Sequence, residues 1–254
     1  SSDVCSSDLV LDAFRALKEE GLIRHISVST HLEHEKVDTM LEEGDGLFES
    51  MLIGLNALNY HLRYPGAEAA ARRNMGVVTM NTLGGGILTE YADKFPFLLK
   101  SSDKNMVEAA LRFNLSLSAV SVALVGFRNI QDIDEAVAAV DRFEALTSDE
   151  IVAIQEQMAK AHQDFCTQCG YCSDCPAEVP VTRLMEAYNK RLLEGPQAAM
   201  DQMKWHWWTP DVVKLLEDCV RCGQCEAACT QQLPILDRFD QLRQDYLILV
   251  AGKQ

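Results

Sequence analysis

The chain has 254 residues, of which 48% are hydrophobic and 24% are charged, which is typical of a folded globular protein and excludes a disordered one. Its 23 Lys and Arg residues against 38 Asp and Glu residues give a net charge of −15. This balance argues against binding to nucleic acid or anionic membranes, because both need positive charge to meet phosphates. The longest apolar stretch, residues 119–127, contains Ser121 and Gly126 and is far shorter than the roughly 18 residues of a membrane span.

Nine cysteines are present, and eight of them lie between Cys166 and Cys229. The sequence shows no basic and apolar stretch of the kind that forms a secretion signal. Closely spaced Cys-x-x-Cys pairs without such a signal indicate metal binding in a reducing compartment and not a secreted disulfide scaffold. We therefore expect a cytoplasmic metalloprotein.

Residues 1–9 repeat the tripeptide Ser-Ser-Asp, and the segment resembles a translated sequencing adapter. We expect this segment to be a non-native leader, and we assign no function to Cys5. A polar cap for the helix that follows is the alternative.

Residues 10–146 alternate between short β-prone runs and amphipathic helices. Strands are expected at 23–29, 47–55, 76–80 and 120–125. Helices are expected at 9–19, 30–44, 67–74, 104–114 and 130–143. This alternation predicts βα units on a parallel sheet.

A second domain, residues 147–254, is expected to be helical. The capping box Thr147-Ser148-Asp149-Glu150 predicts a connector helix that ends near residue 162. Further helices are expected at 181–193, 197–205, 212–217 and 236–249, between clusters of cysteines. The tryptophans Trp205, Trp207 and Trp208 are expected to pack between these helices, with shielding of a metal centre as the alternative.

Several segments of the first domain resemble the aldo/keto reductase family, in the family's order along the chain. They are Leu17–Ser29, Val77–Leu88, Ala109–Phe113 and Ala123–Asn129. The resemblance implies a (β/α)8 TIM barrel, which takes roughly 250 residues, or about 31 for each βα unit. Residues 10–145 therefore correspond to about four units, matching the last four of the barrel. The family's catalytic Asp, Tyr, Lys and His lie on earlier strands, so we assign no catalytic residue.

The same resemblance implies that this half of the barrel holds a nicotinamide dinucleotide, NAD(P), in the full-length parent. The positions that match the family's cofactor contacts are Ser29, Thr30, Met80, Asn81, Leu83, Gly84, Gly126, Arg128 and Glu135. An Arg suits a 2′-phosphate through its fork geometry. Three positions depart from the family pattern: Ser27, Leu52 and Ala136.

The cysteines form two runs of four, each within about ten residues. The first run is Cys166, Cys169, Cys172 and Cys175, and the second is Cys219, Cys222, Cys225 and Cys229. Such spacing lets thiolates from a tight loop wrap a small iron–sulfur cube, as in the [4Fe–4S] ligand runs of bacterial ferredoxins. The first run closes after two intervening residues instead of three, and Thr230 follows the second run where Pro is usual. Two structural Zn(Cys)4 sites remain the alternative.

The span between the runs is expected to be helical, which resembles the dicluster ferredoxin extension that a subset of aldo/keto reductases carries. In two-cluster ferredoxins the fourth cysteine of each run binds the cluster of the other run. We therefore expect one [4Fe–4S] cluster on Cys166, Cys169, Cys172 and Cys229, and a second on Cys219, Cys222, Cys225 and Cys175. Closure of the first run by its own Cys175 is the alternative.

Together these features predict an iron–sulfur oxidoreductase that transfers electrons between NAD(P), two clusters and a small-molecule substrate or a redox partner protein. A pure electron-transfer module with a barrel remnant, and a zinc-stapled interaction domain, are the alternatives. We expect the chain alone to be inactive in carbonyl reduction, and we expect neither nucleic acid nor membrane as a partner.

Overall fold

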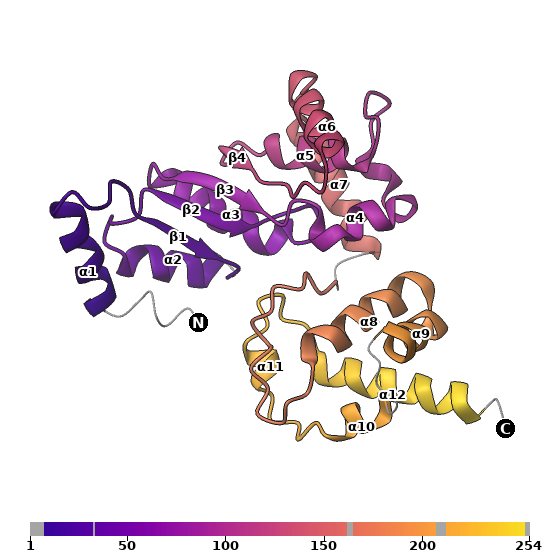
Figure 1. Cartoon of the computed structure of the whole chain (residues 1–254). Coiled ribbons are helices and arrows are strands. Elements are labelled where there is room, and N and C mark those ends of the chain that lie inside the picture. The colour runs from indigo at the N-terminus through magenta and orange to yellow at the C-terminus, as the bar shows by residue number, and fades with distance from the viewer. Residues whose placement is uncertain (1–7, 33, 162–164, 207–211, 252–254) are drawn as a thin grey trace. The chain divides into compact units, whose positions relative to one another are not determined.

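The computed structural model describes residues 8–32, 34–161, 165–206 and 212–251 (Figure 1). The chain forms two compact units, Ser1–Gln163 and Asp164–Gln254. Most of the expected leader, residues 1–7, lies outside the described residues, as do Trp207 and Trp208. The last two leader residues, Asp8 and Leu9, are the first residues of helix α1.

Four strands of the first unit form one parallel sheet in the order β1-β2-β3-β4. Their bounds are β1 Ser27–Thr30, β2 Ser50–Gly54, β3 Gly76–Met80 and β4 Val122–Ala123. The principal helices of this unit are α1 Asp8–Glu19, α2 His34–Glu43, α3 Tyr60–Arg72, α4 Ile87–Glu90, α5 Met106–Leu115, α6 Ile130–Asp141 and α7 Ser148–Ala161. Neighbouring strands that are consecutive in the chain and joined by helices form a partial α/β barrel sheet, as the sequence predicts.

The two faces of this sheet differ in burial. Along β1, β2 and β3 the side chains of one face are buried: Val28, Thr30, Met51, Ile53, Val77 and Thr79. Helix α3 packs against β2 and β3, and α2 packs against α3 (Figure 1). On the other face Ser29 is exposed, and Leu52 and Met80 are half-buried. This second face carries the side chains that would point into a closed barrel.

Several elements differ in length from those expected. Strands β1 and β2 are shorter than the runs at 23–29 and 47–55. Helix α3 begins at Tyr60 and not at Ala67, and Pro65 lies inside it, where it removes one backbone donor without ending the helix. Strand β4 is reduced to Val122–Ala123, although Ser121 and Leu124 still donate backbone hydrogen bonds to β3. Three short 3-10 helices, η2 Gly84–Gly86, η3 Ala92–Lys94 and η4 Pro96–Leu98, surround α4 and were not expected.

Helix α7, which the sequence places in the second domain, belongs to the first compact unit. The backbone N–H of Leu146, just before this helix, donates to Ser116 Oγ at 2.8 Å. Glu150, in its first turn, pairs with Lys100 at 2.6 Å. These contacts hold the connector helix against residues of the barrel unit, so the observed division lies after residue 163 and not at residue 146.

The described part of the second unit consists of helices and loops. The helices are α8 Val181–Glu194, α9 Pro196–His206, α10 Val212–Glu217, α11 Gln224–Ala227 and α12 Ile235–Ala251. Helices α8, α9 and α12 pack on one another around Leu184, Met203 and Leu242, which are fully buried. Among the described residues of the whole chain, no helix is long and apolar enough to cross a membrane.

Candidate metal centre and nucleotide pocket

The loops of the two cysteine runs repeat the same backbone conformation. In the first run, Gln168 and Gly170 flank Cys169 and have φ angles of 54° and 84°. In the second run, Arg221 and Gly223 flank Cys222 and have φ angles of 55° and 75°. This left-handed conformation on both sides of the second cysteine turns each loop tightly. A Cβ on Gly223 would meet no atom within 4 Å, so the space beside this residue is open.

The repeat continues through the last cysteine of each run. The carbonyl of Cys175 accepts from Glu178 N at 3.0 Å, and the carbonyl of Cys229 accepts from Gln232 N at 3.1 Å. The carbonyls of Pro180 and Pro234 then accept the backbone N–H groups of Leu184 and Arg238, each at 3.1 Å, and helices α8 and α12 follow. The one-residue difference between the runs therefore lies in their closing intervals alone.

The first three cysteines of run one lie close to the end of run two. Thr230, next to Cys229, places its Oγ1 atom 3.4 Å from Cys169 Sγ. Burial, with a smaller contribution from the thiols of Cys169, Cys172 and Cys229, raises the pKa of Cys166 to about 12. The thiols of Cys169, Cys172 and Cys229 therefore all lie near Cys166.

The second run is more open. Cys222 is exposed, whereas Cys219 and Cys225 are half-buried. Burial raises the pKa of Cys225 to about 11, with smaller contributions from Glu226, Cys219 and Cys172. Cys175 packs against the helical core. Among the described residues, no three His, Cys, Asp or Glu side chains stand close enough to hold a single metal ion.

The cysteines are in contact with several polar groups. These groups were not identified as functional from the sequence. The backbone N–H of Leu233 donates to Cys229 Sγ at 3.4 Å. Thr182 Oγ1 lies 3.9 Å from Cys172 Sγ. The amide of the buried Asn189 pairs with both backbone groups of Cys166. Donors aimed at cysteine sulfur suit thiolates that hold a metal cluster, because they stabilise negative charge on sulfur.

The nine residues predicted for nucleotide binding fall into two groups in the first unit. Ser29 is exposed at the end of β1, and the buried Thr30 accepts a hydrogen bond from Leu32 N at 2.9 Å. Met80 ends β3, and the carbonyl of Asn81, which has a φ angle of 60°, accepts a hydrogen bond from Asn56. The pair Ser29 and Thr30 and the pair Met80 and Asn81 lie at the carboxyl ends of parallel strands, where barrel enzymes have their active sites.

The second group surrounds a pocket of about 280 Å³. Leu83, Gly126, Arg128 and Glu135 all line it, together with Asp132, and Gly84 lies next to Leu83. The Arg128 backbone N–H donates to Asp132 at 2.8 Å, and its side chain pairs with the same carboxylate at 3.5 Å. One guanidinium therefore shares this pocket with two carboxylates.

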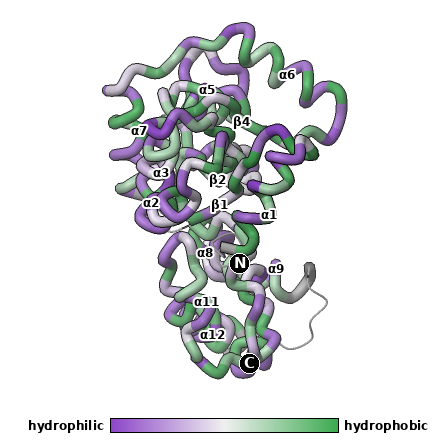
Figure 2. Tube along the Cα trace, turned by 90° about the vertical axis from the view of Figure 1, so that its left-hand side faces the viewer, coloured by the Kyte–Doolittle hydropathy of each residue, from purple (hydrophilic) through white to green (hydrophobic). Residues whose placement is uncertain are grey.

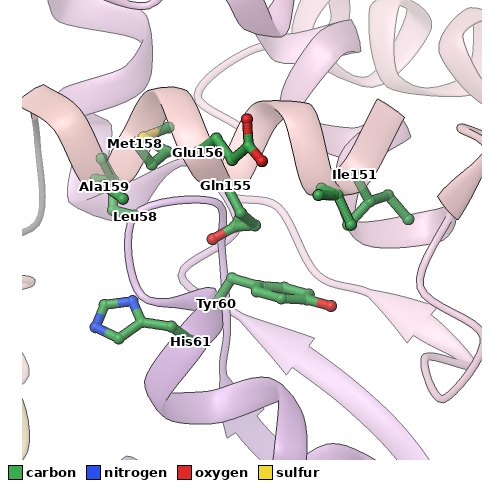
Figure 3. A pocket seen from close by; sticks show the side chains of 9 residues that line it. Leu58, Tyr60, His61, Ile151, Gln155, Glu156, Met158 and Ala159 are labelled. Atoms are coloured by element: carbon green, nitrogen blue, oxygen red, sulfur yellow. The ribbon is translucent and has the colours of Figure 1, made fainter. Parts of the chain in front are cut away.

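A further pocket, of about 340 Å³, lies between α7 and the N-terminal end of α3 (Figure 3). Gln155 points from α7 toward Tyr60, and His61 lies beside Tyr60 (Figure 3). Burial raises the pKa of Tyr60 to about 12, so its phenol holds its proton at neutral pH. Burial, with a smaller contribution from Arg63, lowers the pKa of His61.

Comparison with known proteins identifies the first unit. The sequence model of the aldo/keto reductase family matches residues 4–159, more than half of the chain. The chain belongs to the aldo/keto reductase family. The predicted membership is therefore confirmed, and residues 165–234 match a 4Fe-4S dicluster domain. No curated protein matches the chain.

Two solved structures of an aldo-keto reductase from Bacillus halodurans are similar to part of this chain. The holo form has 21% identity and a TM-score of 0.49, and covers 58% of this chain and 55% of its own. The apo form has 22% identity and a TM-score of 0.48, and covers 59% of this chain and 56% of its own. The chain thus spans about half the length of these relatives.

Proposed function

We propose that the chain forms the cofactor and cluster part of an iron–sulfur oxidoreductase, in which electrons pass between NAD(P), two [4Fe–4S] clusters and a small-molecule substrate or redox partner protein. The observation that carries this proposal is the joining of an aldo/keto reductase unit to a dicluster domain with two structurally repeated cysteine loops. A reducing compartment such as the cytoplasm keeps the eight thiols available for iron.

We assign the clusters by crossed ligation. Cys166, Cys169, Cys172 and Cys229 hold the first cluster, and this set is supported by the 3.4 Å approach of Thr230 to Cys169. Cys219, Cys222, Cys225 and Cys175 hold the second, and this set is supported by the matching turns after Cys175 and Cys229. Bound clusters would supply one-electron transfer. The protein's own part is to fix the thiolates, to donate hydrogen bonds to them and to keep water from Cys166.

In the first unit, Gly126, Arg128 and Glu135 would hold the adenosine end of the dinucleotide, and the turn from Asn81 to Gly84 would approach its pyrophosphate. Arg128 is exposed enough to turn from Asp132 toward a phosphate, since 89% of its side chain is accessible. The family's catalytic Asp, Tyr, Lys and His match no position of this sequence, so the chain alone does not reduce a carbonyl substrate. A positioned proton donor contributes about 10²–10⁴-fold to such a reaction.

Anaerobic reconstitution with iron and sulfide tests the proposal. We expect a brown protein with about eight iron atoms per chain and no zinc. Cys229→Ser should alter the cluster on the first run, and Cys175→Ser the cluster on the second. A colourless protein that binds zinc in place of iron would refute the iron–sulfur function. Loss of the first run's cluster in Cys175→Ser would refute crossed ligation alone.

A further inference from the structure

The turns that follow the last cysteine of each run are equivalent in structure but differ in the residue at their second position. The turn that starts at Cys175 has Pro176 in its second position, and the turn that starts at Cys229 has Thr230 there. Both turns are closed by a backbone hydrogen bond across three residues, and both end in a residue with a φ angle close to 54°. Pro suits the second position of such a turn, because its ring fixes the φ angle required there. The backbone at position 230 is therefore compatible with Pro.

Thr230 lacks the fixed φ angle that a Pro would supply at this position, but it carries a hydroxyl group. The residue is 6% exposed, and its Oγ1 atom lies 3.4 Å from Cys169 Sγ, a sulfur 61 positions away in the sequence. A cysteine that holds a cluster is a thiolate and has no proton to give, so the hydroxyl must be the donor in this contact. The exposed Pro176 has no donor to offer at its matching place.

A donor to a ligand sulfur acts differently on the two redox states of a cluster. Reduction adds one electron and makes the cluster with its thiolates more negative. A hydrogen bond to sulfur stabilises this more negative state more strongly, and hydrogen bonds to the sulfurs are among the factors that set cluster potentials. Solvent screens this hydrogen bond only in part, because the donor Thr230 is buried and the acceptor Cys169 is half-buried.

We propose that Thr230 is a positioning residue that raises the reduction potential of the cluster on Cys166, Cys169, Cys172 and Cys229, by donating its hydroxyl hydrogen to Cys169 Sγ. This inference rests on the proposed iron–sulfur function. Thr182 adds a weaker contact of the same kind, since its Oγ1 atom is 3.9 Å from Cys172 Sγ and also 3.0 Å from Ser173 Oγ.

A redox titration of the reconstituted chain, followed by electron paramagnetic resonance, tests the proposal with three variants of one residue. Thr230→Val removes the hydroxyl and keeps the shape, Thr230→Pro copies the matching turn, and Thr230→Ser keeps the donor. We expect the Val and Pro variants to lower the potential of one of the two one-electron steps and to leave the other in place. Thr230→Ser should titrate like the wild type.

Pro176→Thr is the matched control, because it makes the reverse change in the equivalent turn. It should leave unmoved the step that shifts in Thr230→Val. Unchanged potentials in Thr230→Val and Thr230→Pro, with both clusters present, would overturn the inference, and so would an equal shift of both steps. Loss of a cluster in Thr230→Val but not in Thr230→Ser would assign the hydroxyl to cluster assembly and also overturn it. A wild-type chain that binds no cluster would instead refute the proposed function.

Discussion

Asn189 of helix α8 pairs with both backbone groups of Cys166 through its side-chain amide. Its Oδ1 atom accepts from Cys166 N at 2.8 Å, and its Nδ2 atom donates to Cys166 O at 2.7 Å. Both residues are buried, with exposed fractions of 4% and 8%. The side-chain amide of Asn189 thus fixes Cys166, the first cysteine of the run, to the helical core. It pairs with the backbone N–H and C=O of Cys166 as a neighbouring β-strand would.

Asn189→Ala should destabilise the second unit by about 2–6 kcal/mol, because it leaves both backbone groups of Cys166 unpaired and each buried unpaired group costs about 1–3 kcal/mol. Denaturant unfolding followed by circular dichroism measures this loss, and the cluster absorbance of the variant should decay faster. Gln197→Ala is the control, since Gln197 is exposed and bonds only with Asp201 among the described contacts, and should change stability by less than about 0.5 kcal/mol. Equal stability of Asn189→Ala and the wild type would contradict this role.

The pairing of Asn189 with Cys166 is a long-range contact that the sequence did not predict, whereas elements set by local patterns were predicted. Strand β3 occupies the expected residues, because alternation and flanking turn residues set its limits locally. The cysteine runs were equally evident from spacing. Contacts such as Thr230 with Cys169 depend on how two distant loops meet, and no local pattern encodes them. Likewise, the local pattern predicted helix α3 only from residue 67, whereas this helix, which packs on β2 and β3, begins at Tyr60.

Gly84, one of the predicted nucleotide residues, is required by both conformation and space. Its φ angle is 63°, and an added Cβ would lie 2.7 Å from Leu58 Cδ1. Gly84→Ala should therefore lower the unfolding free energy of the first unit by about 1–3 kcal/mol, through strain and overpacking of the buried Leu58. Gly126→Ala is the matched control from the same group, because a Cβ there meets no atom within 4 Å. A similar cost for the two variants would contradict the argument.

The stability of the first unit should depend on pH through His31. Burial, with a smaller contribution from Arg63, lowers the pKa of His31 below its ordinary value of 6.5. Below about pH 6.5 His31 therefore binds a proton more readily in the unfolded chain than in the folded chain. The unfolding free energy of the first unit is thus highest above about pH 6.5 and decreases as the pH falls further. Unfolding free energies measured at about pH 7.5 and about pH 5.5 should differ less in His31→Gln than in the wild type.

His61 contributes in the same direction, because burial also lowers its pKa. The double variant His31→Gln, His61→Gln should therefore show a smaller pH dependence than either single variant. An unchanged pH dependence in all three variants would show that neither histidine is held neutral in the folded unit.

Helix α6 presents an unusual apolar stripe to solvent. Ile130, Ile133, Val137 and Val140 follow helical spacing and are 76%, 43%, 54% and 56% exposed. Hydrophobic and hydrophilic residues alternate along this helix (Figure 2). Exposed patches of this kind promote association, and the short outer strand β4, with Val122 45% exposed, adds an uncovered sheet edge.

We expect the isolated chain to self-associate at micromolar concentration, and we expect the double variant Val137→Lys, Val140→Lys to do so less, because both changes place charge within the stripe. Light scattering at matched concentrations measures the difference. Gln131→Lys adds a positive charge to α6 outside the stripe. It therefore separates the effect of removing apolar side chains from the effect of changing the net charge. A wild-type chain that remains a monodisperse monomer would show that this apolar surface does not drive association.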